Sequence, residues 1–280
     1  MDTARTVVAL RAKIRTWRSA GDRIALVPTM GALHAGHLSL IEAGKRRAHR
    51  VVASIFVNPK QFGANEDLDR YPRQEARDAE LLRQAGCDLL FLPPADAVYP
   101  AGYSTSVSVA GLDRPMEGAS RPGHFDGVAT VVTKLLLMAF PDVAIFGEKD
   151  WQQLAIIRRL AIDLNIPAEI VGAPIIREAD GLAMSSRNAY LQPQQRAVAG
   201  ALFRTLQAAA STITGGAAVT DTLSAARAGL ESAGFRVDYL LLADEQTLQL
   251  LNQPLPGARL FVAAKLGATR LIDNFPVIPR

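Results

Sequence analysis

One stretch decides the fold, residues 24–57, which read IALVPTMGALHAGHLSLIEAGKRRAHRVVASIFV. The stretch begins with the apolar run Ile24–Pro28, continues through a helical pattern from about Gly36 to Ala48, and ends in a second apolar run, Val51–Val57. Short apolar runs on either side of a helix indicate two parallel strands, because parallel neighbours need a long crossover connection. The stretch therefore predicts a βαβ unit, and with it a parallel sheet that is covered on both faces.

The same alternation of strand and helix extends over the first two thirds of the chain. Further helices are predicted over residues 4–19, Gln74–Ala85, Phe125–Phe140 and Trp151–Leu164, and further strands over Asp88–Leu92, Val143–Phe146 and Ala168–Val171. Right-handed crossovers then give a doubly wound, Rossmann-like α/β domain. In such a domain, ligands bind beyond the carboxyl ends of the strands.

The pattern changes after about residue 174. Ile175–Asn188 has the composition of a loop, and two helices and three short strands are predicted after it, at Gln194–Ala210, Thr220–Ala233, Val237–Leu242, Arg259–Ala264 and Thr269–Asp273. Two helices followed by a small antiparallel sheet form an α+β unit. We therefore expect a Rossmann-like domain over residues 1–175, which binds nucleotide and substrate, and a smaller α+β domain over residues 176–280.

Composition excludes several classes of protein. The 280 residues are 49% hydrophobic and 21% charged, which is typical of a globular protein and argues against disorder. No apolar run approaches the ~20 residues that a membrane helix needs, and charged residues interrupt the N-terminal segment where a secretory signal would be apolar. The single cysteine, Cys87, excludes an internal disulfide and favours the cytoplasm. The net charge is +4, and Lys45-Arg46-Arg47 is the nearest approach to a basic cluster, which argues against nucleic-acid binding.

The first predicted strand runs directly into a turn, Pro28–His37, that carries two histidines. Backbone N–H groups at a helix N-terminus favour an anion, and His34 and His37 are three residues apart, so both lie on one side of the first helical turn. Gly31 and Gly36 would let a nucleotide lie close to the backbone. We interpret the turn as a phosphate site. A metal pair or two incidental histidines are the alternatives, although a metal site usually needs further ligands.

Polar segments also follow the other predicted strands and helix starts. After the second strand, Asn58 and Gln61 offer neutral donors and acceptors, which suit hydroxyl or carboxylate groups of a substrate. After the strand that ends at Phe146, Lys149 can neutralise phosphate, and Asp150 can accept hydrogen bonds from ribose hydroxyls. The segments are Asn58–Gly63, Gly123–Gly127, Gly147–Gln153 and Met184–Arg187. Taken singly, each also fits a plain polar loop or a helix edge.

In their order and spacing, these segments together resemble the pantothenate synthetase (pantoate–β-alanine ligase) family of the nucleotidyltransferase superfamily. The resemblance runs from about residue 5 to residue 275. The two-histidine turn and the Met-Ser-Ser-Arg loop resemble the two ATP motifs of the superfamily, and Asn-Pro-Lys-Gln-Phe at 58–62 is more particular to the family. One departure lies in the helix after Pro72, where Arg77 stands at a commonly acidic position while Asp78 is retained. A metal or dimer role of this helix therefore stays open.

The resemblance implies a set of site residues. The implied catalytic residues are His37, as proton donor, with His34, Lys149 and Arg187. Gln61 is the implied contact of both pantoate and β-alanine, and Gln153 is a second contact of pantoate. The implied ATP-binding residues are Met30, Gly31, Ala32, Leu33, His34, Ala35, Gly36, His37, Gly147, Glu148, Lys149, Asp150, Ile176, Met184, Ser185, Ser186 and Arg187, with Ile176 at a position where valine is frequent. No residue is assigned as a metal ligand.

The resemblance also implies a reaction in two steps. The carboxylate of (R)-pantoate would attack the α-phosphate of ATP to give pantoyl adenylate and pyrophosphate, and the amine of β-alanine would then form pantothenate and release AMP. Mg²⁺ is the expected cofactor, bound with ATP. We expect a cytoplasmic homodimer without nucleic-acid or membrane partners, in which the C-terminal domain is a lid that shields the anhydride from water. Cys87 is expected to be buried rather than catalytic.

Three other functions are kept as alternatives. A nucleotidyltransferase that transfers AMP to another cofactor precursor would share the histidine turn but has no need of residues 58–61. A non-catalytic RNA-binding module would explain the basic pI, and failure to bind ATP would favour it. A dinucleotide-dependent oxidoreductase would need a Gly-x-Gly-x-x-Gly turn after a strand, which the sequence lacks.

Overall fold

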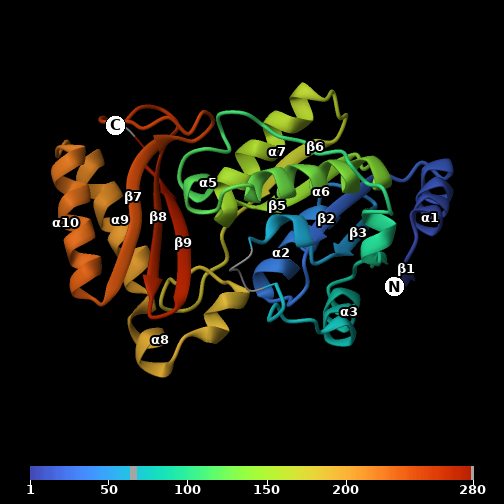
Figure 1. The fold of residues 1–280 in the computed structure, drawn as a ribbon, viewed down its shortest axis with the longest axis horizontal. Helices are drawn as coiled ribbons and strands as arrows, with labels where there is room; N and C mark the ends of the chain where they lie inside the picture. The colour runs from blue at the N-terminus through green and yellow to red at the C-terminus, as the bar shows by residue number, and fades with distance from the viewer. Residues whose placement is uncertain (64–67, 279–280) are drawn as a thin grey trace. The chain divides into compact units, whose positions relative to one another are not determined.

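The computed structural model describes residues 1–63 and 68–278 (Figure 1). The chain divides into two compact units. The first unit comprises Met1–Glu148 and Ile156–Pro174, and the second comprises Lys149–Ala155 and Ile175–Arg280. The main segment of the second unit begins at Ile175. The unit also includes Lys149–Ala155, which the sequence pattern placed in the first domain.

A parallel sheet forms the centre of the first unit, as predicted, and it has six strands (Figure 1). The strands are β1 (Asp2–Ala4), β2 (Ile24–Thr29), β3 (Arg50–Ile55), β4 (Leu89–Phe91), β5 (Val143–Gly147) and β6 (Glu169–Ala173), in the order β1-β4-β3-β2-β5-β6. Strand β1 was not predicted, because three residues at the edge of a sheet are too few to show a pattern. The central strand β2 is buried on both faces, which explains its continuous apolar run.

Helices cover both faces of this sheet. The helices of the first unit are α1 (Val7–Ser19), α2 (Ala35–Lys45), α3 (Glu75–Gln84), α4 (Ala95–Val98), α5 (Glu117–Ser120) and α6 (His124–Ala139), with a short 3-10 helix, η1 (Pro59–Gln61). Helices α2 and α3 pack on one face, where Ile41 and Leu82 join the core under the strands, and α1 and α6 pack on the other (Figure 1). Helix α7 (Trp151–Asp163) follows the 3-10 helix η2 (Glu148–Asp150), and the first residues of α7 belong to the second unit.

The strand order reverses beside β2. The chain continues from β2 to β3 and β4 on one side, whereas β5 and β6 lie on the other side. Ala25 pairs with Val143, so the carboxyl ends of β2 and β5 lie next to each other. This topological switch point is where open α/β sheets bind their ligands. The fold therefore brings the two-histidine turn after β2 beside Gly147 at the end of β5.

The second unit contains a three-stranded antiparallel sheet, β7 (Phe235–Asp244), β8 (Ala258–Leu266) and β9 (Thr269–Pro276), joined in sequence order. Its other elements are η3 (Ser186–Tyr190), α8 (Pro193–Ala199), α9 (Ala201–Thr214) and α10 (Val219–Ser232). The single helix predicted over Gln194–Ala210 is divided at Gly200, where a Cβ would lie 2.6 Å from the carbonyl oxygen of Asp180. Within residues 1–63 and 68–278, no helix is both long and apolar enough to span a bilayer.

Candidate active site

The two-histidine turn of the first unit is a helix cap. His34 is the N-cap of α2, and its Nδ1 accepts a hydrogen bond from the backbone N–H of Gly36 at 3.1 Å. Nδ1 of His37 accepts from the backbone N–H of His34 at 3.4 Å, and the two ring centroids are 4.1 Å apart. A ring nitrogen that accepts carries no proton, so hydrogen-bond geometry assigns the proton of each neutral ring to Nε2. The turn thus carries two adjacent Nε2–H donors.

A buried carboxylate holds the backbone that leads into this cap. Asp78, on α3, accepts hydrogen bonds from the backbone N–H groups of Ala32 at 2.8 Å and Leu33 at 2.9 Å. Gly31 and Ala32 have φ angles of +86° and +52°, in the left-handed region. A Cβ on Gly31 would lie 3.0 Å from Oδ2 of Asp78 and 3.2 Å from Cγ2 of Ile55.

The contacts of Gly31 give a structural reason for a glycine at this position. Gly31 lacks a side chain because a carboxylate and the end of β3 approach it, and its own left-handed φ also favours glycine. The sequence showed Asp78 only as a retained acidic residue. Its partners lie 45 and 46 residues earlier in the chain, so no local signal could have connected them.

Gln61 lies on η1, directly after β3, and its side-chain amide is held from both ends. Its Oε1 accepts from Nδ2 of Asn58 at 3.0 Å, and its Nε2 donates to Sδ of Met30 at 3.2 Å. Gln61 is 9% exposed, and the structure places it in contact with the two-histidine turn. Nε2 carries a second N–H that can donate to a substrate. The sequence placed the loop with Gln61 and the two-histidine turn at the ends of two predicted strands. It did not show that the two segments are in contact.

Asn58 has a different role from the one expected. Its Nδ2 donates to Gln61 and to the carbonyl oxygen of Gly127, and its Oδ1 accepts from the backbone N–H of Lys60 and from the hydroxyl of Tyr99. Asn58 is buried, and these four hydrogen bonds occupy the whole capacity of an amide. It therefore orients Gln61 rather than a substrate.

The start of α6 supports the same loop. Nδ1 of His124 lies 2.8 Å from the carbonyl oxygen of Gln61, so it must donate, and its Nε2 lies 3.0 Å from Nη1 of Arg121. A Cβ on Gly127 would lie 2.2 Å from the carbonyl oxygen of Lys60, so α6 can approach η1 only with glycine at this position. The motif Gly123–Gly127 thus packs against the loop that carries Gln61.

In the second unit, Lys149 and Asp150 precede α7. Lys149 Nζ lies 3.8 Å from Asp150 Oδ2, and the two side chains are 20% and 49% exposed. The next residue, Trp151, is buried: its indole N–H donates to the carbonyl oxygen of Glu245 at 2.7 Å, and the guanidinium of Arg259 lies 3.4 Å from its ring centroid. A buried anchor therefore follows directly after two partly exposed charged residues. Gln153, two residues further on, is half-buried.

The Met184–Arg187 loop leaves a short two-stranded turn. Met184 N–H donates to the carbonyl oxygen of Ile176 at 2.9 Å, and Arg177 forms an isolated bridge with Ala183. Ser185 caps η3, because its hydroxyl accepts from the backbone N–H of Arg187 at 3.2 Å. The Ser185 hydroxyl, which the resemblance implies as an ATP contact, thus already accepts a hydrogen bond within the loop. Ile176 and Met184 therefore lie side by side.

The structure thus distributes the sequence-predicted residues over two units. The first unit holds Met30, Gly31, Ala32, Leu33, His34, Ala35, Gly36, His37, Gln61, Gly147 and Glu148, and the second holds Lys149, Asp150, Gln153, Ile176, Met184, Ser185, Ser186 and Arg187. In the part of the chain that the structure describes, no three His, Cys, Asp or Glu side chains gather as a metal site would require. A two-histidine helix cap beside the switch point of a parallel sheet is typical of the class of α/β nucleotide-binding proteins.

The comparison with known sequences gives the particular family. Residues 2–276 match the sequence model of the pantoate-beta-alanine ligase family, and the chain belongs to this family of ligases. It is 57% identical over 279 residues to a pantothenate synthetase from Paramagnetospirillum magneticum, covering 98% of this chain and 97% of the relative. It is 56% identical over 278 residues to a pantothenate synthetase from Sphingopyxis alaskensis, covering 99% and 100%. The family resemblance drawn from the motifs is confirmed.

Solved structures agree with this assignment. The pantothenate synthetase of Thermus thermophilus superposes with a TM-score of 0.95 at 48% identity, covering all of both chains. The pantoate-beta-alanine ligase of Francisella tularensis, which was crystallised with beta-gamma ATP and beta-alanine, gives a TM-score of 0.83 at 34% identity over 98% of this chain and 97% of that one. The α/β architecture with a second, smaller α+β unit is therefore that of the family.

Proposed function

We propose that the protein condenses (R)-pantoate with β-alanine to give pantothenate, through a pantoyl-adenylate intermediate, with release of AMP and pyrophosphate from ATP. The observation that carries the proposal is the contact between Gln61 Nε2 and Met30 Sδ, at 3.2 Å. It places a neutral amide donor against the turn that bears His34 and His37. The residue proposed for the acid substrate and the turn proposed for the nucleotide phosphates thus lie together at the carboxyl ends of β3 and β2.

The first step brings two anions together. An oxygen of the pantoate carboxylate attacks the α-phosphorus of ATP, the bond between this phosphorus and its bridging oxygen breaks, and pyrophosphate leaves with the electron pair. The site must therefore align the reactants and supply hydrogen bonds to the charge that develops on the phosphates. We assign this task to the Nε2–H groups of His34 and His37, with the hydrogen bond from His37 directed to the leaving group.

In the second step, the amine of β-alanine attacks the acyl carbon of the adenylate. The bond between this carbon and the phosphate oxygen breaks, AMP leaves, and the nitrogen loses a proton to give the amide. Gln61 is assigned to both substrates, because its neutral amide can donate without holding a carboxylate too tightly in the ground state. Asn58 and His124 fix that amide and its backbone, so the donor is oriented before a substrate binds.

The residues of the second unit are assigned to the nucleotide and to pantoate. Lys149 and Arg187 would bind phosphate oxygens, since they supply positive charge, and Asp150 would accept from the ribose hydroxyls. Gln153 would contact pantoate. The remaining proposed ATP contacts are Met30–Gly36 and Gly147–Glu148 in the first unit, and Ile176 with Met184–Ser186 in the second.

We also propose that Mg²⁺ accompanies ATP. Its ligands would be phosphate oxygens of the substrate, and its chemistry would be to neutralise their charge. This assignment fits a chain in which the described residues form no cluster of three metal-ligating side chains. A homodimer in the cytoplasm completes the proposal, and a nucleotide substrate together with a single buried thiol supports that location.

ATP–pyrophosphate exchange tests the proposal. Labelled pyrophosphate should enter ATP only when pantoate is present, and β-alanine should not be required, because the adenylate forms in the first step. Addition of β-alanine should then convert exchange into net formation of pantothenate and AMP. Exchange without pantoate, or exchange that depends on another acid, would instead identify a different adenylating reaction.

A further inference from the structure

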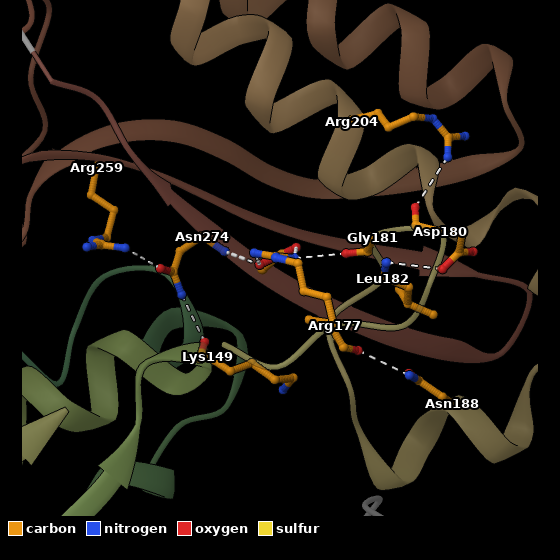
Figure 2. Close-up of polar contacts among 11 residues, drawn as sticks. Lys149, Arg177, Asp180, Gly181, Leu182, Asn188, Arg204, Arg259 and Asn274 are labelled. Atoms are coloured by element: carbon orange, nitrogen blue, oxygen red, sulfur yellow. Dashed lines mark hydrogen bonds and ion pairs between the residues drawn. The ribbon is translucent and has the colours of Figure 1, made fainter. Parts of the chain in front are cut away.

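Asn274 on β9 holds the backbone of Lys149. Its Nδ2 donates to the carbonyl oxygen of Lys149 at 3.0 Å, and its Oδ1 accepts from Nη1 of Arg259 at 2.7 Å (Figure 2). Arg259 in turn stacks on Trp151, two residues beyond Lys149. Asn274 is 2% exposed, so these contacts are shielded from water. The backbone position of Lys149 therefore depends on a side chain 125 residues later in the sequence.

Asp273, the preceding residue of β9, holds the turn before the Met184–Arg187 loop. Nη1 and Nη2 of Arg177 donate to its two carboxylate oxygens at 2.7 and 3.0 Å. Nη1 of Arg177 also donates to the carbonyl oxygen of Gly181 at 3.0 Å (Figure 2). The Arg177 guanidinium lies 3.9 Å from the ring centroid of Phe203. The Asp273 side chain is 1% exposed. A bidentate pair of this kind has a defined geometry as well as a strong attraction.

The same turn is closed by further contacts. Arg177 bridges Ala183, and Asn188 Nδ2 donates to the carbonyl oxygen of Ala183 at 3.1 Å (Figure 2). Asp180 accepts from the backbone N–H of Leu182 and pairs with Arg196, whose guanidinium lowers the pKa of the Asp180 carboxyl. Arg177 thus ties this turn to β9. The position of the turn sets where the following segment, Ser185–Arg187, begins.

From these contacts we infer that Asp273 and Asn274 are positioning residues for the nucleotide. Successive residues of a strand point to opposite faces of a sheet, so one dipeptide can hold two segments at once. Asn274 sets the backbone of Lys149, and Asp273 sets, through Arg177, the segment that leads to Arg187. The inference rests on the proposed binding of phosphate by Lys149 and Arg187. A displacement of such groups by about 1 Å can cost as much as 100-fold in rate.

A matched pair of variants separates positioning from stability. Asp273→Asn removes the charge opposite Arg177, and Asp238→Asn removes the charge opposite Arg270, which donates to Asp238 at 2.8 Å between β9 and β7. Both changes break an Asp–Arg pair in the same sheet. We expect Asp273→Asn to lower kcat/KM for ATP in pyrophosphate exchange by ~10- to 100-fold. Asp238→Asn should change it less than twofold, at a temperature where both proteins are folded by circular dichroism.

Double-mutant cycles measure the coupling between two substitutions in kcat/KM. A residue that only stabilises the fold would show no such coupling. If Asn274 acts through Lys149, Asn274→Ala should lower kcat/KM for ATP at least tenfold in the wild type but less than about twofold in a Lys149→Ala background. Asp273→Asn should behave likewise in an Arg187→Ala background. Losses that multiply in full in these backgrounds would show that the two residues only stabilise the sheet, and would overturn the inference.

The same double-mutant cycles can be measured on binding alone. Calorimetric titration with a non-hydrolysable ATP analogue gives the Kd of each variant without the reaction. If the wild type bound the analogue but showed no pantoate-dependent exchange, the proposed function would fail while the positioning cycles could still be read from Kd. If Lys149→Ala and Arg187→Ala left binding and exchange unchanged, the assignment of these residues would fail, and the inference with it. Arg177→Lys keeps the charge but loses the bidentate geometry, and a normal Kd and kcat/KM in this folded variant would equally overturn the inference.

Discussion

At the scale of single residues, the site combines side chains that face a substrate with side chains that only hold them. Gln61 and His37 belong to the first kind in the proposed reaction, whereas Asn58 and Asp78 have their hydrogen-bonding capacity directed at the protein. The distinction matters for mutagenesis, because the first kind should affect chemistry with little change in stability. The second kind should affect both.

Replacing Gln61 with glutamate tests whether the site needs a neutral amide at this position. Gln61→Glu keeps an Oε1 acceptor for Asn58, so the loop should stay in place, but it adds a negative charge beside two carboxylate substrates and removes the Nε2 donor. We expect KM for pantoate and for β-alanine to rise at least tenfold while the Kd of ATP changes less than threefold. Steady-state titration of each substrate measures this. Equal kinetics for both acids in variant and wild type would make Gln61 a bystander.

His37→Ala should remove a donor from the developing charge on the phosphates. Loss of one preorganised donor typically costs ~10²- to 10³-fold in rate, which corresponds to about 3–4 kcal/mol. The His34 cap should persist, because its Nδ1 still accepts from Gly36. Single-turnover formation of the adenylate is the measurement, with thermal unfolding as the control for folding. A near-normal rate would contradict the assigned role of His37.

Asp78→Ala should destabilise the backbone of the two-histidine turn without changing a residue of the turn itself. Without the carboxylate, the N–H groups of Ala32 and Leu33 lose buried acceptors, which typically costs ~1–3 kcal/mol for each unsatisfied group. We expect a lower midpoint of urea unfolding together with slower adenylation, since the left-handed conformation of Ala32 loses its support. A variant that was destabilised but fully active would show that the turn keeps its shape without Asp78.

At the scale of elements, helix α6 packs closely against the loop that carries Gln61, and Gly127 is the residue that allows this close packing. Gly127→Ala would place a Cβ 2.2 Å from a backbone oxygen, so α6 or η1 must shift. Overpacking of this kind typically costs ~1–3 kcal/mol, and the shift should also raise KM for pantoate. Gly229→Ala is the control, because that helical position has no neighbour within 4 Å. It should be neutral or stabilise the protein by up to about 1 kcal/mol in urea unfolding, with unchanged KM.

At the scale of the whole molecule, Cys87 reports on unfolding of the first unit. The thiol is buried, as predicted, and it contacts the carbonyl oxygens of Val51 and Leu89 at 3.4 Å. Burial raises its pKa from 9.0 to about 11. At pH 8 the folded thiol should therefore be protonated and inert to iodoacetamide. Between pH 9 and 11 the thiol ionises more readily in the unfolded chain, so the stability contributed by the buried thiol should fall as pH rises.

Nucleotide binding should slow the labelling of Cys87. A ligand at 100 times its Kd stabilises the folded state by about 2.7 kcal/mol, which corresponds to ~100-fold slower labelling if the thiol reacts only after global unfolding. Mass spectrometry of the alkylated protein, with and without a non-hydrolysable ATP analogue, measures this ratio. If the rate of Cys87 alkylation were the same with and without the nucleotide, the thiol would become exposed through a local opening instead of global unfolding.

The sequence by itself determined the parallel sheet, the order of most elements and the family. These depend on local information: the apolar periodicity of residues 24–57, and motifs such as Met30–His37, are complete within a few tens of residues. The edge strand β1 and the break of the second-unit helix at Gly200 escaped prediction, since a three-residue strand has no period and one helical glycine is a weak signal.

The tertiary structure decided which residues hold the site. Asp78 reaches Ala32 across 46 residues, Asp273 reaches Arg177 across 96, and Asn274 reaches Lys149 across 125. Each pair contains a buried polar side chain, Asp78, Asp273 or Asn274, whose local sequence resembles that of any strand or helix. A buried donor or acceptor must find a partner, but its own sequence does not name that partner. The partner is chosen only when packing of the strands and helices brings two distant segments within hydrogen-bond distance.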